Sequence, residues 1–279
     1  MAPPSAAAPL DAASIRARLA AGETIQIASG RIPVQRYDFS HSDGSVEALL
    51  VRPVGSAAMP GLVLIPGYSR TAYDLLPVAV RFARAGFATL SVSQPGFGGS
   101  TGPADFSGPR TFAAVHAAAQ RFAAEPFVDP TRLGLYGYSR GALAAAQLAT
   151  RTDLFRAAVL GGGIYDFAAA YRQVTLPGIR SNMVEETGMT EEAVRFRSPI
   201  HDVEGLDGPV LIVHGADDLN APPEQARALA DRLRKLGRPH ELIIIAGGTH
   251  SLSVNDIATP AIGFFQRHLS AGTATRAIN

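Results

Sequence analysis

Short runs rich in Val, Ile and Leu alternate with longer Ala-rich amphipathic stretches, and this alternation limits the folds open to the chain. The runs lie at 61–67, 87–96, 132–139, 156–163, 209–215 and 241–247, and the amphipathic stretches at 75–85, 110–124, 140–150, 223–236 and 255–269. Continuous apolar runs are typical of strands buried on both faces. The pattern therefore predicts an α/β fold: a mostly parallel, twisted sheet of about eight strands with helices on both faces.

Segments outside this alternation complete the predicted organisation. The runs 34–39 and 45–53, joined by the turn sequence HSDG, predict an antiparallel hairpin. The long segment 165–207 is expected to form a small helical lid over the strand ends. For 279 residues we predict an N-terminal extension over 1–30 that is partly disordered, a single domain over 31–272 that includes the lid, and a C-terminal tail over 273–279.

Composition excludes several classes of partner and cofactor. The chain has 25 basic and 24 acidic residues spread along its length, so we expect neither a nucleic-acid nor a membrane partner. It has no cysteine, which excludes disulfides, thiolate metal sites and a cysteine nucleophile. The seven histidines show no H-E-x-x-H or H-x-x-E-H spacing. We therefore expect no metal and no cofactor.

The start of the chain bears on its compartment. The first fourteen residues, MAPPSAAAPLDAAS, carry no basic residue ahead of an apolar core and so do not resemble a signal peptide. A cytoplasmic protein is favoured. The alternative is a periplasmic or secreted protein from which a signal peptide was removed, leaving this Ala- and Pro-rich stretch as a linker.

The apolar run at 132–139 ends in a serine between two glycines, within the sequence Gly137-Tyr-Ser-Arg-Gly141. G-x-S-x-G between a strand and a helix is the context of a nucleophile elbow, a tight and strained turn that projects the serine hydroxyl out of the sheet. Glycine at both flanks leaves room for the strand and helix to approach each other. The alternative is that Ser139 only caps the helix that follows.

Serine becomes a nucleophile when a histidine removes its proton and an acid orients that histidine. The run at 209–215 is followed by Asp217 and Asp218, and the run at 241–247 by His250. Because the carboxyl ends of parallel strands meet at one edge of a sheet, we expect Ser139, His250 and one of these aspartates to meet there.

These motifs resemble the α/β-hydrolases over about residues 45–270, and most of all the prolyl-oligopeptidase-like and dienelactone-hydrolase-like serine hydrolases. The pattern H-G-x-x-D-x-x-V-P, frequent in these hydrolases, aligns its acid with Asp218 and so favours Asp218 over Asp217 as the acid. RSPIHDV at 197–203, followed by PVLIVHG, resembles the approach to the acid strand in peptidases of the prolyl oligopeptidase type. In that family, such compact spacing implies no large cap domain between nucleophile and acid.

An oxyanion hole in such an elbow uses the backbone N–H of the residue after the nucleophile, here Arg140. The second donor is expected from the loop after the run at 61–67. Prolyl-oligopeptidase-like enzymes have a tyrosine there whose hydroxyl is a donor, and Tyr68 falls on that position. Either its N–H or its hydroxyl could serve, and the alternative is a tyrosine that only packs under the loop.

The predicted function is a serine hydrolase that cleaves carboxylic esters through Ser139, Asp218 and His250 and an acyl-enzyme. A peptidase acting on short peptides is the main alternative, followed by an acyltransferase or a thioesterase. A catalytically silent binding protein on the same scaffold would not react with a fluorophosphonate at Ser139. Tyr138, Tyr165 and Tyr171 are candidate substrate-binding residues for a small-molecule ester or a short peptide. The sequence does not indicate an oligomeric state.

Overall fold

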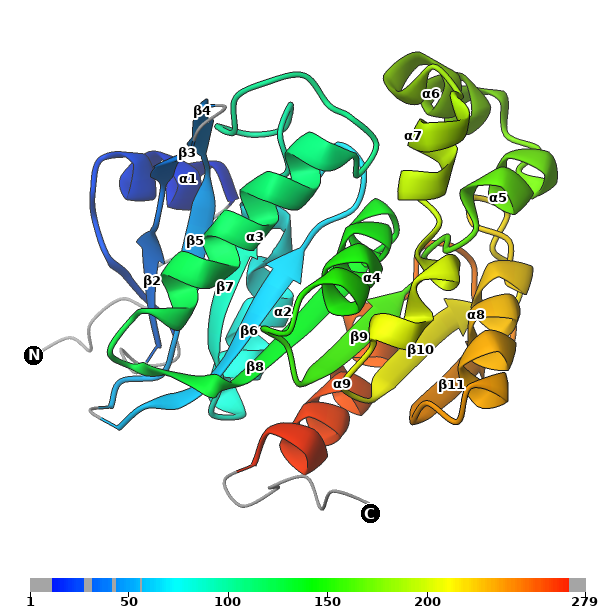
Figure 1. The fold of residues 1–279 in the computed structure, drawn as a ribbon. Coiled ribbons are helices and arrows are strands. Elements are labelled where there is room, and N and C mark those ends of the chain that lie inside the picture. Colours follow the sequence, from blue (N-terminus) through cyan, green and yellow to red (C-terminus); the bar gives the residue numbers. More distant parts are fainter. Residues whose placement is uncertain (1–11, 28–31, 42–43, 56, 271–279) are drawn as a thin grey trace, which may run out of the picture.

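The structure is a computed structural model that describes residues 12–27, 32–41, 44–55 and 57–270 (Figure 1). Its centre is a nine-stranded sheet of order β1-β2-β5-β7-β6-β8-β9-β10-β11. The strands are β1 (Ile25–Ile27), β2 (Ile32–Arg36), β5 (Ala48–Val51), β6 (Met59–Ile65), β7 (Ala88–Val92), β8 (Val128–Tyr138), β9 (Ala157–Gly161), β10 (Val210–Gly215) and β11 (His240–Ile245). The neighbours from β7 to β11 are all parallel, whereas β1, β2 and β5 pair antiparallel. The predicted mostly parallel sheet is confirmed.

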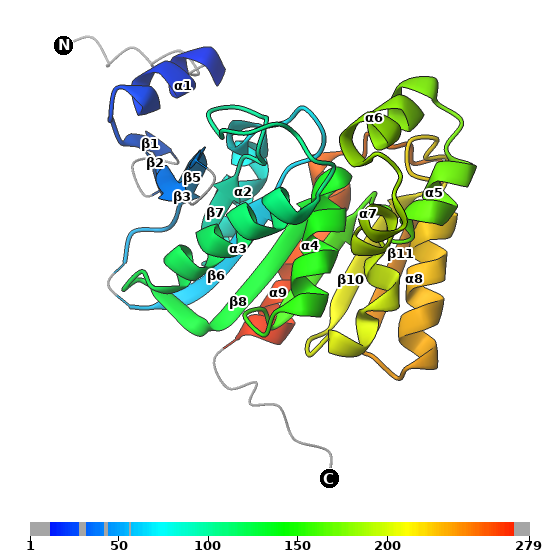
Figure 2. The same ribbon diagram turned by 45° about the horizontal axis from the view of Figure 1, so that its top comes forward.

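Helices cover both faces of this sheet (Figures 1 and 2). One face carries α1 (Ala12–Ala20), α2 (Leu76–Arg84), which follows the short 3-10 helix η1 (Ala72–Leu75), and α9 (Val254–Leu269). The other face carries α3 (Pro109–Ala123), α4 (Arg140–Arg151) and α8 (Glu224–Lys235). No helix in the described ranges is both long enough and apolar enough to cross a bilayer.

Successive residues of the central strands enter opposite cores. In β6, Leu62 and Leu64 pack with α2 and α9, whereas Val63 and Ile65 pack with α3 and α4, and all four are fully buried. Side chains alternate in this way because a strand has a period of two. Continuous apolar runs therefore mark strands covered on both faces, which explains why these strands could be located from sequence.

The N-terminal region contains more structure than predicted. β2 pairs antiparallel with β5, as expected for the hairpin, and the tip of the hairpin forms a separate two-stranded sheet of β3 (Phe39–His41) and β4 (Gly44–Val46). Helix α1 and strand β1 lie within the predicted extension 1–30, and β1 is the additional, ninth strand. A strand of three residues is too short to give a periodic signal. The predicted tail 273–279 lies outside the described residues.

The segment between β9 and β10, called the lid below, is helical. It contains α5 (Phe167–Gln173), α6 (Pro177–Thr187), α7 (Glu191–Phe196) and the 3-10 helices η2 (Pro199–His201) and η3 (Val203–Gly205). Figures 1 and 2 place α5, α6 and α7 together at the end of the molecule toward which β9 and β10 point. The lid thus lies close to the carboxyl ends of the parallel strands.

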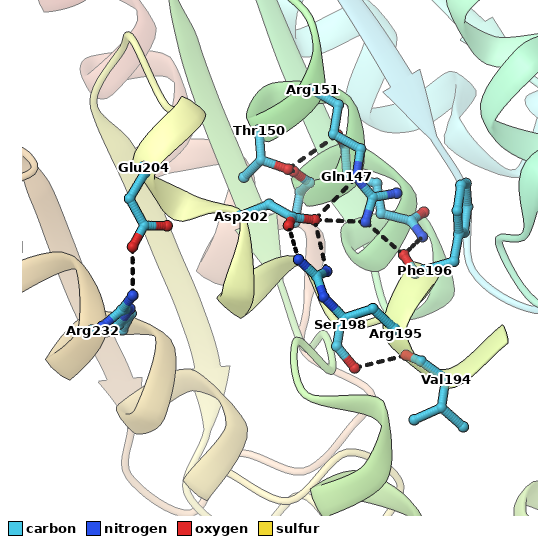
Figure 3. Close-up of polar contacts among 11 residues, drawn as sticks. Gln147, Thr150, Arg151, Val194, Arg195, Phe196, Ser198, Asp202, Glu204 and Arg232 are labelled. Carbon is cyan, nitrogen blue, oxygen red and sulfur yellow. Dashed lines mark hydrogen bonds and ion pairs between the residues drawn. The ribbon is translucent and has the colours of Figure 1, made fainter. Parts of the chain in front are cut away.

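The base of the lid is attached to the C-terminal part of α4 by hydrogen bonds and ion pairs among Gln147, Arg151, Arg195, Phe196 and Asp202 (Figure 3). We call these five residues the base cluster. Arg151 donates to the Asp202 carboxylate at 2.7 and 3.1 Å, and Arg195 of α7 donates to the same carboxylate. Gln147 and Arg151 also donate to the carbonyl of Phe196 at 2.9 and 2.8 Å. These contacts tie the end of α7 to α4.

Candidate active site

Ser139 lies in the turn between β8 and α4, where the nucleophile elbow was predicted. Its backbone has φ 54° and ψ −122°, a strained conformation for a residue with a side chain. A Cβ atom on Gly137 would come within 2.2 Å of the carbonyl oxygen of Gly141, and one on Gly141 within 2.0 Å of that of Ile65. Glycine at both positions is therefore required by the close approach of strand and helix.

The Ser139 hydroxyl is directed to a histidine and does not cap α4. In the described part of the chain its side chain makes no capping hydrogen bond, although Ser139 occupies the N-cap position. Its Oγ lies 2.8 Å from Nε2 of His250, in the loop after β11. On the other side of the ring, Nδ1 lies 2.8 Å from Oδ2 of Asp218. Because a carboxylate can only accept, Nδ1 donates, and the neutral ring presents the lone pair of Nε2 to the serine hydroxyl.

Asp218 is held in the turn after β10 and is only 2% exposed. Its Oδ1 accepts hydrogen bonds at 2.9 Å from the backbone N–H groups of Asn220 and Ala221. Burial by itself would raise the pKa of Asp218, but hydrogen bonds from His214, His250 and the Ala221 N–H outweigh it and hold the pKa far below its usual value. The Asp218 carboxyl group is thus held in its ionised form next to Nδ1 of His250.

Two neighbours of Asp218 were also weighed from sequence. Asp217 is exposed, and its backbone N–H donates to the carbonyl of Gly248. The carboxylate that lies next to Nδ1 of His250 is that of Asp218. His214, fully buried at the end of β10, lies with Nε2 2.7 Å from the carbonyl oxygen of Ala221 and 3.4 Å from Oδ2 of Asp218. His214 thus supports the turn that contains Asp218 by its hydrogen bond to the Ala221 carbonyl.

The loop after β6 passes directly over Ser139. A Cβ atom on Gly67 would lie 3.2 Å from that of Ser139, so the backbone just before Tyr68 approaches the serine closely. Gln94 supports this loop from below, since its Nε2 donates to the carbonyl of Pro66 at 2.6 Å. The N–H of Arg140 opens α4 on the other side of Ser139, where a helix leaves its first N–H groups unpaired. The segments that carry the Tyr68 and Arg140 N–H groups therefore both adjoin Ser139.

A cavity of about 560 Å³ opens above Ser139 and His250. Apolar side chains line it from two sides: Leu75, Val78, Leu252, Val254 and Ile257 near α2 and α9, and Ile164, Val174, Ile179, Met183 and Ala221 near the lid. Most of these residues were not identified from sequence, because residues of core and cavity have the same apolar pattern. No group of three or more His, Asp or Glu side chains in the described ranges could hold a metal ion.

The three tyrosines expected to bind substrate lie in different places. Tyr138 lines the cavity, donates to the carbonyl of His250 and accepts from the N–H of Leu252, so it also supports the histidine loop. Its burial raises the pKa of Tyr138 to about 12, and the Leu252 hydrogen bond opposes this. Tyr165 is fully buried in the core, and Tyr171 stacks on Arg180. Neither is among the described residues that line the cavity, which corrects the prediction for both.

Comparisons with known proteins concern both family and fold. A model of the prolyl oligopeptidase family matches residues 106–271. Two uncharacterized peptidases of Bacillus subtilis (strain 168) are similar in sequence. YuxL is 25% identical over 236 residues, 78% of this chain and 36% of YuxL, and YtmA is 26% identical over 217 residues, 74% of this chain and 81% of YtmA. The chain thus spans about a third of the length of YuxL.

Solved structures share the fold. The acylaminoacyl peptidase of Pyrococcus horikoshii has a TM-score of 0.75 at 20% identity, covering 88% of this chain and 43% of that chain. The acetyl xylan esterase from Paenibacillus sp. R4 has a TM-score of 0.74 at 18% identity, covering 88% of both chains. The fold is that of the α/β-hydrolases. Because the family model matches more than half of its residues, the chain belongs to the prolyl oligopeptidase family of serine hydrolases.

Proposed function

We propose that the protein hydrolyses uncharged carboxylic esters of small or medium size with a Ser139–His250–Asp218 triad. The observation that carries this proposal is the chain of two 2.8 Å hydrogen bonds from the serine oxygen through the imidazole to the buried carboxylate, at the base of a cavity of about 560 Å³. Ser139, Asp218 and His250 follow β8, β10 and β11, and parallel strands bring residues at their carboxyl ends to one edge of the sheet. Nucleophile, base and acid in this hydrogen-bonded order are the groups that serine catalysis uses.

The reaction follows from this geometry. Oγ of Ser139 attacks the ester carbonyl carbon while its proton passes to Nε2 of His250, and Asp218 stabilises the imidazolium ring. The N–H groups of Arg140 and Tyr68 donate to the oxyanion of the tetrahedral intermediate. His250 then gives the proton to the departing alkoxide, which leaves an acyl group on Ser139. A water molecule attacks the acyl carbon while its proton passes to His250, the bond from the acyl carbon to Oγ of Ser139 breaks, and His250 returns the proton to Oγ as the carboxylic acid is released.

The charges around the cavity favour a neutral substrate. Of the described residues that line it, one has a carboxylate, Asp74, whose oxygens already accept hydrogen bonds from Thr71 and Arg70. Of the two arginines that line it, Arg140 is paired with Glu186 and Arg70 with Asp74. A substrate with a free ammonium or carboxylate would therefore lose water without gaining an unpaired partner, which costs binding energy.

A peptidase acting on short peptides is the second candidate. It is favoured by the family match and by the two relatives that are named peptidases, YuxL and YtmA. An amide is cleaved by the same groups, with His250 protonating the departing amine. The two candidates differ in leaving group and in the charge next to the cleaved bond, so a substrate panel separates them.

The test combines labelling with such a panel. A fluorophosphonate should modify wild-type protein, forming an Oγ–phosphorus bond as fluoride leaves, and should leave Ser139→Ala unmodified. p-Nitrophenyl esters from acetate to octanoate should be hydrolysed faster than p-nitroanilides of single amino acids with a free amine. Absence of labelling would refute the triad, and faster cleavage of the anilides would favour the peptidase.

A further inference from the structure

The side chain that follows the nucleophile is joined to the lid. The guanidinium of Arg140 donates two hydrogen bonds of 2.8 Å to the carboxylate of Glu186, which is on α6. The Arg140 side chain is 4% exposed and that of Glu186 13% exposed. A paired fork of this kind fixes both distance and orientation, and burial shields it from solvent screening. The lid is thereby attached within one residue of Ser139.

Aromatic rings hold the same guanidinium. Its Cζ lies 4.4 Å from the ring centroid of Tyr68 and 4.1 Å from that of Phe106. The N–H of Phe106 also donates to Glu186, at 2.7 Å. Nε of Arg140 has no hydrogen-bond partner among the described residues, so Glu186 supplies the hydrogen bonds that orient this guanidinium. We call Glu186, Arg140, Tyr68 and Phe106 the elbow cluster.

Backbone strain is concentrated at this cluster. Five non-glycine residues in the described ranges have positive φ, and four of them are next to or within it: Ser69 (56°), Phe106 (43°), Ser107 (54°) and Ser139 (54°). Strained residues stay in place only where surrounding contacts hold them. Ser107 donates from Oγ to the carbonyl of Arg140 at 3.0 Å, so the strained loop and the elbow are in direct contact.

A second lid residue holds the loop from outside. Arg197 is 3% exposed and donates to the carbonyls of Phe106 and Asp105 at 2.9 and 2.6 Å. It also donates to the carbonyl of Ala193 on α7 at 2.8 Å. The loop that supplies the Phe106 ring is therefore fixed to the lid independently of Glu186. Loss of the Glu186 carboxylate would release the guanidinium and the Tyr68 ring more than the loop.

We propose that Glu186 is a positioning residue for the oxyanion hole. Glu186 orients the Arg140 guanidinium, and the guanidinium supports the Tyr68 ring. The ring in turn holds the loop after β6, which contains the strained Ser69 and places the Tyr68 N–H next to Ser139. The lid would then act on the rate of the chemical step, and not only on access to the cavity. This inference rests on the proposed function, since it assigns a role in the same reaction.

Glu186→Gln tests the inference because the amide matches the carboxylate in size but cannot accept from both Arg140 nitrogens and the Phe106 N–H. The control is Glu185→Gln, on the same helix, where the exposed carboxylate bonds only to Ser181 among the described residues. For p-nitrophenyl acetate, kcat per titrated active site should fall about 10- to 100-fold, less than the ~100- to 1,000-fold cost of losing an oxyanion donor. KM should change less than threefold, and the control should match wild type.

A small reagent separates positioning from substrate binding. Diisopropyl fluorophosphate places its phosphoryl oxygen in the oxyanion hole but is too small to depend on the lid walls. We expect Glu186→Gln to slow its reaction with Ser139 by a factor similar to that in kcat. Arg140→Lys keeps the charge but loses the fork and the stacking. If both residues act as one unit, the variant that carries both Glu186→Gln and Arg140→Lys should react with the reagent at the rate of the slower single variant, within about threefold.

The outcomes are distinct. Unchanged kcat per site and unchanged phosphorylation rate in Glu186→Gln would overturn the inference and leave the proposed function intact. The inference would also be overturned if the rate loss in the double variant equalled the product of the losses in the two single variants. A wild-type protein that the reagent does not modify would remove the proposed function, and the inference with it. A lower Tm in Glu186→Gln with normal turnover per titrated site would indicate a structural role only.

Discussion

The lid is joined to α4 at both ends of that helix, and the two attachments differ in burial and in their distance from the triad. At its first residue, Arg140 pairs with Glu186 in the elbow cluster, where the side chains are 4% and 13% exposed. At its last residue, Arg151 pairs with Asp202 in the base cluster, where they are 21% and 19% exposed (Figure 3). An arginine thus meets a carboxylate in two different environments, at the first and at the last of the twelve residues of α4.

This difference indicates different roles for similar ion pairs. A buried pair costs much desolvation energy and contributes little net stability, so its value is in fixing one geometry, as we propose for the elbow cluster. A partly exposed pair costs less and its carboxylate can accept several hydrogen bonds, as Asp202 does from Arg151 and Arg195. The elbow cluster should therefore control rate, and the base cluster should control stability.

The largest expected effect is on kcat, from a substitution in the triad next to the elbow cluster. Asp218→Asn should lower kcat about 10⁴-fold, because an amide can donate to Nδ1 and so stabilise the wrong tautomer of His250. Asp217→Asn is the matched control, since its side chain is exposed one position earlier, and should stay within threefold of wild type. Ester hydrolysis per active site measures both. The reverse ranking would transfer the acid role to Asp217.

A smaller effect tests how the elbow cluster acts on the oxyanion hole. Tyr68→Ala removes the ring that packs on Arg140 and should lower kcat roughly 10- to 100-fold. Tyr68→Phe keeps the ring and the backbone N–H, and should stay within threefold. Steady-state kinetics of wild type and both variants on one p-nitrophenyl ester measures the two effects. A loss of 100-fold or more in Tyr68→Phe would make the hydroxyl the donor and would contradict the proposed use of the N–H.

The base cluster should behave in the opposite way. Asp202→Asn should destabilise the protein by about 1–2 kcal/mol, because several partly exposed charge-assisted hydrogen bonds weaken together. For a chain of this size that corresponds to a Tm lower by roughly 2–4 °C. kcat should not change. Glu204→Gln, which removes the more exposed pair with Arg232 shown in Figure 3, is the control and should shift Tm by about 1 °C or less. A fall in kcat for Asp202→Asn would remove the distinction between the two clusters.

What could be predicted from sequence follows the same division. The contact between Ser139 and His250 could be predicted because one ends an apolar run and the other follows a run by three positions, and the strand character of these runs is a local property. The pair of Arg140 and Glu186 could not, because the residues are 46 positions apart and Glu186 lies in a segment without strand or helix alternation. Contacts between a lid and a sheet depend on tertiary packing that has no local sequence pattern.

The tyrosines and the first strand show the same limit. Tyr165 and Tyr171 follow a strand end closely, as cavity residues often do, but the packing of the lid buries Tyr165 in the core. β1 was missed because three residues do not establish a period. Tyr138 belongs to the elbow motif itself and lies beside the cavity. Its role in substrate binding stays a prediction. The position of a residue inside the motif follows from the strand–turn–helix geometry, whereas that of a residue near the motif depends on how the lid packs.

The smallest expected effect concerns acid pH. Burial by itself would raise the pKa of Asp202, but hydrogen bonds from Arg195 and Arg151 outweigh it and lower the pKa below its usual value. A carboxyl group with a lowered pKa stabilises the folded state above its unfolded pKa of about 4, and this stabilisation disappears as the pH falls through the folded pKa. The Tm difference between wild type and Asp202→Asn should therefore be constant from pH 8 to about pH 5 and shrink below about pH 4. Calorimetry across this range measures it, and a difference that grew toward acid pH would contradict the assignment of the base cluster as a stabilising ion-pair network.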